Sequence, residues 1–245
     1  MSFLNIARDG AIWTLTMNQP ETRNALTGNT AVEEFVQVCD EIRRDASVKA
    51  VILTGAGPIF SSGGNVKDMQ RFFDDALTPD AIREEYRQGI QRIPRALTQL
   101  DVPVICAING PAIGAGLDLT CMCDIRIASE TATFAESFVR VGIVPGDGGA
   151  WLLPRAVGRA KAAEMAFTGE AIDAQEALAC GLVSRVVPAD QLLPTARALA
   201  DKIAANPGAV MRMTKRLLRE GEHSTLESLL ELSAGYQALA HKTAD

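Results

Sequence analysis

The chain has 245 residues and a mass of 26.1 kDa, with 47% apolar and 22% charged residues. This size and balance predict a globular chain without a membrane span, because no apolar run approaches the roughly 18 to 20 residues that cross a bilayer. The net charge of −6 and the pI near 5.1 argue against a nucleic-acid partner, which clustered Lys and Arg would bind.

Strands and helices alternate along the first half of the chain. Alternating apolar and polar residues predict a strand over 11–17, and apolar residues at helical spacing predict a helix over 27–44. A buried strand follows over 48–54. After a more polar stretch, 74–95, the rhythm resumes, with a strand over 104–108, a glycine-opened helix over 114–123 and a strand over 124–128. This alternation indicates an α/β fold.

The C-terminal part of the chain is wholly helical in pattern. Helices are predicted over 191–205, 208–220 and 225–242, with no further strand beyond about residue 188. We expect Lys215 and Arg216 on a solvated face of the second of these helices. This helical tail either packs on the core or contacts another subunit.

The number and positions of the cysteines and histidines argue against disulfides, histidine-dependent catalysis and a metal site. The five cysteines form an odd set in mostly apolar stretches, which favours reduced core thiols over disulfides. His223 and His241 lie 18 residues apart in the helical tail, so a Ser-His-Asp triad, a Cys-His pair or a zinc site is poorly supported and no metal is expected.

Residues 1–9 lack a basic segment followed by a long apolar run, so we expect no signal peptide and a cytoplasmic location.

Two glycine-rich turns, 55–66 and 109–119, each follow a buried strand. Glycine lets backbone N–H groups approach a ligand closely, and the first N–H groups of a helix lack intrahelical partners. Such turns suit an oxyanion, although ordinary tight turns would show the same spacing. A nucleotide cofactor is excluded, because Leu119 stands where a dinucleotide motif has its third glycine and no phosphate-binding Gly-x-x-x-x-Gly-Lys-Ser/Thr occurs.

Five ordered segments, spread over nearly the whole chain, carry a family resemblance. They are Asn18-Gln19-Pro20 with Arg23-Asn24-Ala25-Leu26; Phe60-Ser61-Ser62-Gly63-Gly64-Asn65-Val66; Ala112 to Leu119 with Met122-Cys123-Asp124; Gly142 to Gly149 with Leu153-Pro154-Arg155; and Thr168-Gly169-Glu170 with Gly181-Leu182-Val183. Together they resemble the crotonase (enoyl-CoA hydratase/isomerase) superfamily. The resemblance implies a crotonase-type ββα spiral over 1–190 and a C-terminal helical trimerisation region over 191–245.

The resemblance also implies an acyl-CoA substrate, a homotrimer or homohexamer, and no separate cofactor, because coenzyme A enters as part of the substrate. The family's oxyanion hole falls on the backbone N–H groups of Gly64 and Ala115. Its CoA-binding positions fall on Arg23, Ala25, Ser62, Gly63, Asn65 and Val66.

The sequence departs from the family at the second acid/base position. Hydratases of the family use two glutamates, and these positions fall on Asp118 and on Phe138, which cannot move a proton. Glu136 is offset by two residues, which changes where its side chain is expected to point. We therefore assign the catalytic carboxylates to Asp118 and to Asp147, which lies in a glycine-flanked loop. Helix capping is the alternative role for both aspartates.

The predicted function is hydration or double-bond isomerisation at C2–C3 of an acyl-CoA through an enolate that the oxyanion hole stabilises. The phenylalanine keeps two alternatives open: a CoA-thioester or carbon–carbon hydrolase on the same fold, and a catalytically silent CoA-binding member. We expect residues 69–95, which hold Phe72, Phe73 and Tyr86, to shape the acyl pocket. The pattern leaves open the chain length, branching and aromaticity of the acyl group.

Overall fold

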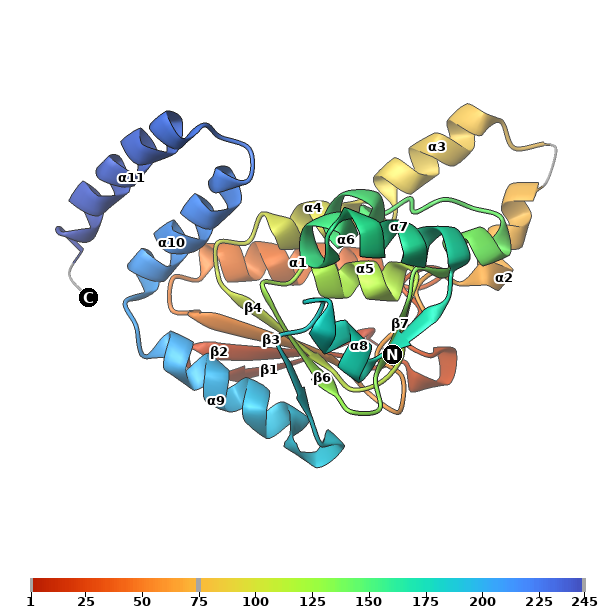
Figure 1. The fold of residues 1–245 in the computed structure, drawn as a ribbon, viewed down its shortest axis with the longest axis horizontal. Coiled ribbons are helices and arrows are strands. Elements are labelled where there is room, and N and C mark those ends of the chain that lie inside the picture. The colour runs from red at the N-terminus through yellow and green to blue at the C-terminus, as the bar shows by residue number, and fades with distance from the viewer. Residues whose placement is uncertain (1, 74–75, 244–245) are drawn as a thin grey trace.

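The computed structural model describes residues 2–73 and 76–243 and contains two β-sheets surrounded by helices (Figure 1). The larger sheet has the strand order β1-β2-β3-β4-β6-β9, with β1 and β2 antiparallel and the other neighbours parallel. Its strands are β1 (Leu4–Asp9), β2 (Ile12–Met17), β3 (Ala50–Gly55), β4 (Val104–Ile108), β6 (Ile125–Ser129) and β9 (Arg185–Val187). The smaller sheet has the order β5-β7-β8, formed by β5 (Ala112–Ile113), β7 (Thr133–Ala135) and β8 (Ala171–Asp173). The predicted α/β class is confirmed.

The helices up to residue 204 lie around the larger sheet, and the one over 79–88, which has no buried residue, projects away from it (Figure 1). They are α1 (Ala31–Arg44), α2 (Val66–Met69), α3 (Pro79–Gln88), α4 (Arg92–Thr98), α5 (Ala115–Cys121), α6 (Gly149–Val157), α7 (Arg159–Thr168), α8 (Ala174–Ala179) and α9 (Leu192–Ala204). Short 3-10 turns occur at Pro20–Thr22, Gln70–Phe73, Ser137–Val141 and Ala189–Gln191. In Figure 1, α1, α4, α5 and α6 lie on one side of the sheet and α9 on the other.

Successive side chains of the central strands enter two different cores. Trp13 and Leu15 pack with α1 and α4 in the larger core, whereas Ile12 and Ile52 pack against α9 in a second core. Side chains alternate between the faces of a strand, so a strand that is buried on both faces needs a nearly continuous apolar run. The predicted boundary at residue 190 stays a prediction, and α9, which follows that boundary, covers one face of the sheet.

Beyond α9 the chain leaves the core as an arm formed by α10 (Gly208–Gly221) and α11 (Leu226–Ala240) (Figure 1). Helix α11 has no buried residue and packs on α10, and Leu226, Leu230 and Leu239 of this helix are exposed. The predicted region 191–245 ends with residues 244 and 245, which lie outside the described residues.

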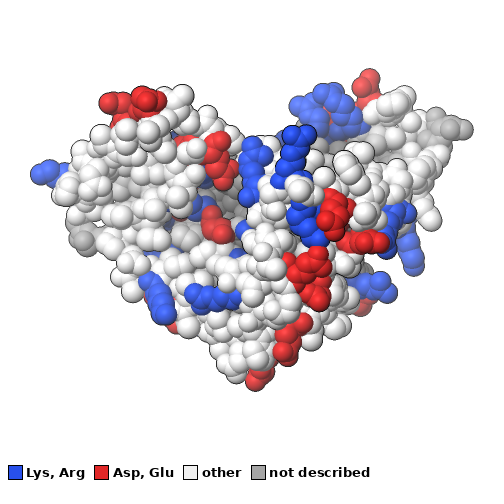
Figure 2. Space-filling model, viewed as in Figure 1, with Lys and Arg blue, Asp and Glu red and all other residues white. Residues whose placement is uncertain are grey.

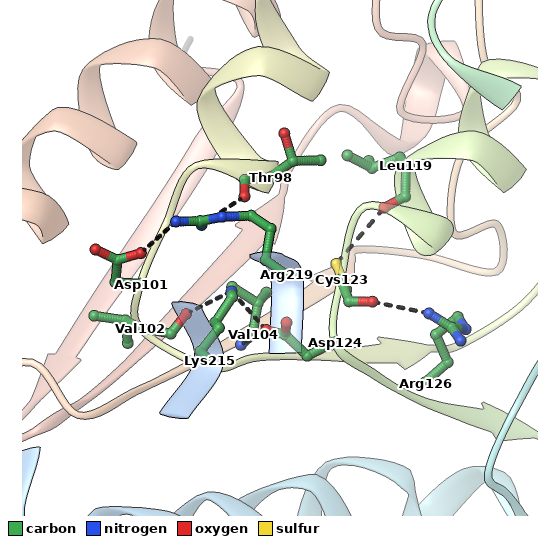
Figure 3. Close-up of polar contacts among 10 residues, drawn as sticks. All are labelled: Thr98, Asp101, Val102, Val104, Leu119, Cys123, Asp124, Arg126, Lys215 and Arg219. Carbon is green, nitrogen blue, oxygen red and sulfur yellow. Dashed lines mark hydrogen bonds and ion pairs between the residues drawn. The ribbon is translucent and has the colours of Figure 1, made fainter. Parts of the chain in front are cut away.

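Arg212, Lys215 and Arg219 of α10 fasten the arm to the core, and Figure 3 shows the last two. The Lys215 ammonium donates to the Asp124 carboxylate at 2.7 Å and to the Val102 carbonyl at 2.9 Å. Arg219 donates to the Asp101 carboxylate at 2.8 Å. The expectation of a solvated face is wrong for Lys215, which is only 9% exposed, because a long lysine side chain can cross apolar surface to reach a carboxylate.

Two expected elements differ from the structure in their details. Helix α1 begins at Ala31, four residues later than predicted, because Asn29 accepts a hydrogen bond from the Ala31 amide and Thr27 accepts one from Asn65. The polar stretch 74–95 contains helix α3, whose first turn is capped by the Thr78 hydroxyl. Residues 74 and 75 of this stretch lie outside the described residues.

The surface charge and the helix lengths can be compared with two predictions, that the chain has no nucleic-acid partner and no membrane span. On the face shown in Figure 2, basic and acidic side chains are interspersed on a mostly uncharged surface, so this face presents no continuous basic patch. Among the described residues, every helix is too short or too polar to cross a membrane. His223 and His241 are exposed, as expected, and the five cysteines are free.

Candidate active site

Three loops are joined by hydrogen bonds at one end of the larger sheet. The buried side chain of Asn24 donates to carbonyl oxygens of the turn that follows β3 and accepts from the Gln19 amide. The Leu26 amide donates to the Gly63 carbonyl at 2.8 Å, and the Ile113 amide donates to the Ser61 carbonyl at 3.0 Å. Asn24 is not among the predicted site residues, although its side chain fixes the turn on which the predicted oxyanion hole depends.

The two predicted oxyanion donors, Gly64 and Ala115, line the same cavity. Ala115 is the first residue of α5, so its N–H precedes the hydrogen-bonded part of that helix. Among the described residues, neither amide donates to a protein acceptor. Two free N–H groups at one cavity wall form the arrangement that polarises a carbonyl oxygen.

Two glycines allow the loops behind these donors to touch. A Cβ on Gly63 would lie 2.4 Å from the Ile113 carbonyl oxygen, and one on Gly116 would lie 2.4 Å from that of Ser61. Gly63 also has a φ of +77°, which favours glycine. Any side chain at either position would therefore push the two donor-bearing loops apart.

The cavity has a volume of about 400 Å³ and a mixed lining. Its apolar wall includes Val32, Met69, Phe72, Ile90, Phe138, Ile143 and Val144, and its polar wall includes Thr27, Asn29, Tyr86 and Asp147. Residues 69–90 supply much of this lining, as predicted for the acyl pocket. Phe73 does not take part, because its side chain is 75% exposed and lies outside this cavity.

Three carboxyl groups meet behind the cavity. Asp118 on α5, Glu136 at the end of β7 and Asp147 before α6 are 0%, 1% and 3% exposed, respectively. The Asp118 carboxyl lies within hydrogen-bonding reach of the carboxyls of Asp147 and of Glu136. Of the three, only Asp147 lines the cavity, so Asp118 and Glu136 lie behind it.

Most oxygens of these three carboxyl groups lack a hydrogen-bond donor. Among the described residues, both oxygens of Asp118, both of Asp147 and Oε2 of Glu136 are buried without a hydrogen-bond donor. The capping alternative is therefore wrong for both aspartates. The N-cap residues of the adjoining helices are Gly114 and Gly148, and neither helix has a side-chain cap. A buried carboxyl without a donor is costly for stability, which makes a functional role the better explanation.

Burial raises the pKa of all three groups, and neighbouring charges add to the rise at Asp118 and Glu136. The pKa of Asp118 lies well above its usual range, because burial and then the charges of Asp147 and Glu136 disfavour the carboxylate. Burial raises the pKa of Glu136 to about 7. The pKa of Asp147 is raised by burial too, while a hydrogen bond from Asp118 opposes this rise.

Neighbouring backbone holds the acidic cluster in place. A Cβ on Gly149 would lie 2.2 Å from Oδ1 of Asp118, so α6 can approach α5 at this point only because the residue is glycine. The Gln91 side chain donates to the Gly146 carbonyl at 2.8 Å and fixes the loop that carries Asp147. The Tyr86 ring contacts the same loop.

The position of the Glu136 side chain differs from the sequence-based expectation. Its offset of two residues does not turn the side chain away from the site, because Glu136 still reaches Asp118. The chain enters a 3-10 turn, Ser137–Val141, directly after this residue, so both Glu136 and Phe138 are buried. The signal available in the sequence was the period-two spacing from Phe134, which is fully buried in β7.

The predicted CoA-binding residues lie on the loops around the oxyanion donors and outside the cavity itself. Arg23 and Val66 are exposed, Ala25 and Gly63 are buried, and Ser62 and Asn65 are half-buried. The Ser62 amide donates to the Arg23 carbonyl at 2.9 Å, which joins the two halves of this group. Their role in binding coenzyme A stays a prediction.

Comparisons with known proteins agree with this geometry. A family model described as enoyl-CoA hydratase/isomerase matches residues 7–245. The chain is 37% identical to a probable enoyl-CoA hydratase of Mycobacterium bovis, over 92% of this chain and 84% of that protein. It is 33% identical to the 1,2-epoxyphenylacetyl-CoA isomerase of Escherichia coli, over 100% of this chain and 92% of that protein.

Solved structures show the same likeness. The crystal structure of an enoyl-CoA hydratase from Bacillus anthracis superposes with a TM-score of 0.92 at 31% identity. That match covers 100% of this chain and 93% of the other. The crotonase fold expected from the sequence is therefore confirmed.

Proposed function

This chain belongs to the enoyl-CoA hydratase/isomerase family, a family of enzymes that act on CoA thioesters, and we propose that it isomerises the double bond of an enoyl-CoA. The observation that carries the proposal is the single buried carboxyl, Asp147, that lines the same cavity as the free amides of Gly64 and Ala115. In the proposed reaction one carboxylate moves one proton between two carbons of the acyl chain.

In this proposal the amides of Gly64 and Ala115 donate hydrogen bonds to the thioester carbonyl oxygen. Removal of a proton from C2 converts the thioester into an enolate, and its negative charge develops on that oxygen. Donors that are already in place stabilise this charge without reorganisation, and the loss of one such donor typically costs about 3 to 4 kcal/mol of transition-state stabilisation. The two donors therefore make the C2 proton acidic enough to be removed.

Asp147 then takes the C2 proton of a 3-enoyl-CoA and returns it to C4, which gives the conjugated 2-enoyl-CoA. The C2–H bond breaks, the double bond moves from C3–C4 to C2–C3, and a new C–H bond forms at C4. No water is consumed, so a second proton-carrying group that faces the substrate is not needed. Asp118 holds its proton beside Asp147 and does not line the cavity.

Phe138 favours isomerisation over hydration. Hydration needs one group that activates water and another that delivers a proton to C2, and the resemblance puts the second family glutamate at Phe138. Its apolar ring lines the cavity at that place and can neither activate water nor carry a proton. The E. coli relative that matches the whole chain is named an isomerase.

Hydration is the second candidate, because several similar proteins carry that name. One of them is the short-chain-enoyl-CoA hydratase of Clostridium acetobutylicum, which is 37% identical over 92% of this chain. In a hydratase, Asp147 would activate the water and the protonated neighbour Asp118 would resupply the proton. The assay described next separates the two reactions.

The test is to incubate the enzyme separately with 3-enoyl-CoA and with 2-enoyl-CoA and to analyse the products by mass spectrometry. Isomerisation leaves the mass unchanged and moves the double bond, whereas hydration adds one water. We expect 3-enoyl-CoA to be converted at least about tenfold faster than 2-enoyl-CoA is hydrated. Faster hydration would overturn the isomerase proposal, and release of free CoA would point to a hydrolase.

Three further proposals extend the family resemblance. Arg23, Ala25, Ser62, Gly63, Asn65 and Val66 would bind the CoA part of the substrate, because they lie on the loops that carry the oxyanion donors. The exposed leucines of α11 would be covered in a homotrimer or homohexamer. The third proposal is a cytoplasmic location.

A further inference from the structure

Two cavities meet at the aromatic side chains of Phe72 and Tyr86. The inner one is the cavity of the candidate active site, with Gly64, Ala115 and Asp147 in its lining. The outer one has a volume of about 610 Å³ and is lined by α3 and by the loop that carries Asp147. The two cavities share a wall, because six of the described residues line both: Met69, Phe72, Tyr86, Ile143, Val144 and Gly146.

The Tyr86 ring closes the gap between α3 and the loop that carries Asp147. A Cβ on Gly146 would lie 2.9 Å from Cε1 of Tyr86, so the ring already packs closely against this glycine. The Gln91 amide donates to the Tyr86 carbonyl at 3.1 Å, and the Gln91 side chain donates to the Gly146 carbonyl at 2.8 Å. Gln91 thereby holds both sides of the gap and fixes its width.

Phe72 is held against the Tyr86 ring. The two ring centroids are 5.8 Å apart, within the range of attractive aromatic pairs. The Arg71 guanidinium lies over the Phe72 ring, 4.4 Å from its centroid, and donates to the Glu85 carboxylate at 2.8 Å. The 3-10 turn that carries Phe72 is therefore tied to α3, and the aromatic pair forms a fixed partition between the two cavities.

The outer cavity is mostly apolar. Ile82 lies four residues before Tyr86 on the same face of α3 and lines the outer cavity but not the inner one. Phe73 and Val144 also line the outer cavity, and both side chains are exposed. An alkyl chain gains free energy with each methylene that it buries, so this surface would bind the tail of a longer acyl group if the partition were absent.

We propose that Tyr86, held against Phe72, ends the acyl pocket and sets the longest acyl chain that the enzyme accepts. The proposal rests on the proposed function, in which the reacting carbons of the acyl group lie beside Asp147 and the oxyanion donors. The substrate is then an enoyl-CoA whose acyl tail ends inside the inner cavity. Tyr86 is a specificity-determining residue in this proposal and moves no proton.

The affinities of saturated acyl-CoAs with chains of about four to about twelve carbons, measured by calorimetry, test the proposal. The wild-type affinity should rise roughly fourfold per added methylene and then level off or fall at the length that reaches the aromatic pair. Tyr86→Ala should move this turning point by about two carbons or more. The first chain beyond the wild-type limit should bind to Tyr86→Ala at least about tenfold more tightly than to the wild type.

Three control variants separate the ring from other causes. Tyr86→Phe keeps the ring and removes only the hydroxyl, so it should keep the wild-type turning point. Phe73→Ala removes an aromatic side chain that lines the outer cavity alone, and it should keep this turning point too. Ile82→Trp, combined with Tyr86→Ala, should fill the outer cavity and restore the wild-type limit.

An unmoved turning point in Tyr86→Ala would overturn the proposal. Weakening of every chain length by the same factor would overturn it too, because a ring that only supports the loop would have that effect. A wild-type affinity that rises steadily to about twelve carbons would show that the pair does not end the pocket. Saturated thioesters bind without reacting, so these outcomes are independent of whether the enzyme proves to be an isomerase.

Discussion

Asp118 and Asp124 lie six residues apart, on α5 and just before β6, yet their surroundings differ completely. Oδ2 of Asp124 accepts hydrogen bonds from the Lys215 ammonium and from the Val104 amide, both at 2.7 Å. Asp118 is fully buried, and neither of its oxygens has a donor among the described residues. A carboxylate with both a cation and an amide stabilises the fold, whereas a buried carboxyl without them destabilises it.

The contrast separates two kinds of acidic site in one protein. At Asp124 the partners come from β4 and from the C-terminal arm, so the carboxylate joins two parts of the chain (Figure 3). At Asp118 the neighbours are two further carboxyls, and their charges add to the effect of burial in raising the pKa of Asp118. Such an unpaired cluster beside a cavity is expected where protons move.

Loss of the cavity-lining carboxyl should have the largest effect. In Asp147→Asn the base of the proposed shuttle is gone, so kcat with 3-enoyl-CoA should fall by about 10³-fold, within the range for general acid–base catalysis. The measurement is steady-state kinetics. Asp68→Asn is the matched control, because Asp68 lines the same cavity but is only half-buried and is paired with Arg71. Similar losses in both variants would show that any carboxylate in the lining suffices.

Backbone amides at the site also fall into two kinds, those that donate a hydrogen bond within the protein and those that do not. The Leu26 amide is satisfied by Gly63, whereas the amides of Gly64 and Ala115 are free for the substrate. Gly63→Ala should separate the two donors and lower kcat about 10²-fold. Gly10→Ala, which has a φ of +56° but no atom within 4 Å of the added Cβ, isolates the cost of the backbone conformation. Unchanged kcat in Gly63→Ala would contradict the assigned oxyanion hole.

Neutralising substitutions at the two aspartates should change the unfolding free energy in opposite directions. Because the folded-state pKa of Asp118 lies above its unfolded value, the folded chain binds the extra proton and loses stability as pH rises above about 4. Asp118→Asn should therefore gain about 1 to 3 kcal/mol of unfolding free energy relative to the wild type at about pH 8, and less at about pH 5. Chemical denaturation at both pH values measures this. Asp124→Asn should lose stability at both, and a loss in Asp118→Asn at about pH 8 would refute the assignment.

The smallest effect is expected at the arm. Lys215→Met removes the cation from Asp124, whose side chain is 34% exposed, so the unfolding free energy should fall by only about 1 to 2 kcal/mol. The kcat value should stay within about twofold of the wild type. Arg216→Met is the control, because its ion pair with Glu220 is exposed and 3.9 Å long. A large loss of kcat in Lys215→Met would show that the arm contributes to the site.

Much of the site could be predicted because glycine and strand patterns are local. Gly64 and Ala115 follow buried strands that are neighbours in the sheet, so the sequence predicts that they lie near each other, and both line one cavity. Glu136 was misplaced despite its period-two spacing from Phe134, because the 3-10 turn after it packs against α7, a contact that the local sequence does not show. Lys215 was misjudged for the same reason, since only the fold brings Asp124 within its reach.

In the proposed reaction Asp147 alone carries a proton from C2 to C4 of the acyl chain. Transfer of deuterium between these carbons is the most direct measurement of this step. The wild-type enzyme converts 3-enoyl-CoA that is deuterated at C2, in ordinary water, and the deuterium at C4 of the product is measured by NMR. The account predicts that part of the deuterium removed from C2 appears at C4, because a buried carboxyl exchanges its proton slowly with solvent. A product without deuterium at C4 would contradict the single-carboxylate shuttle.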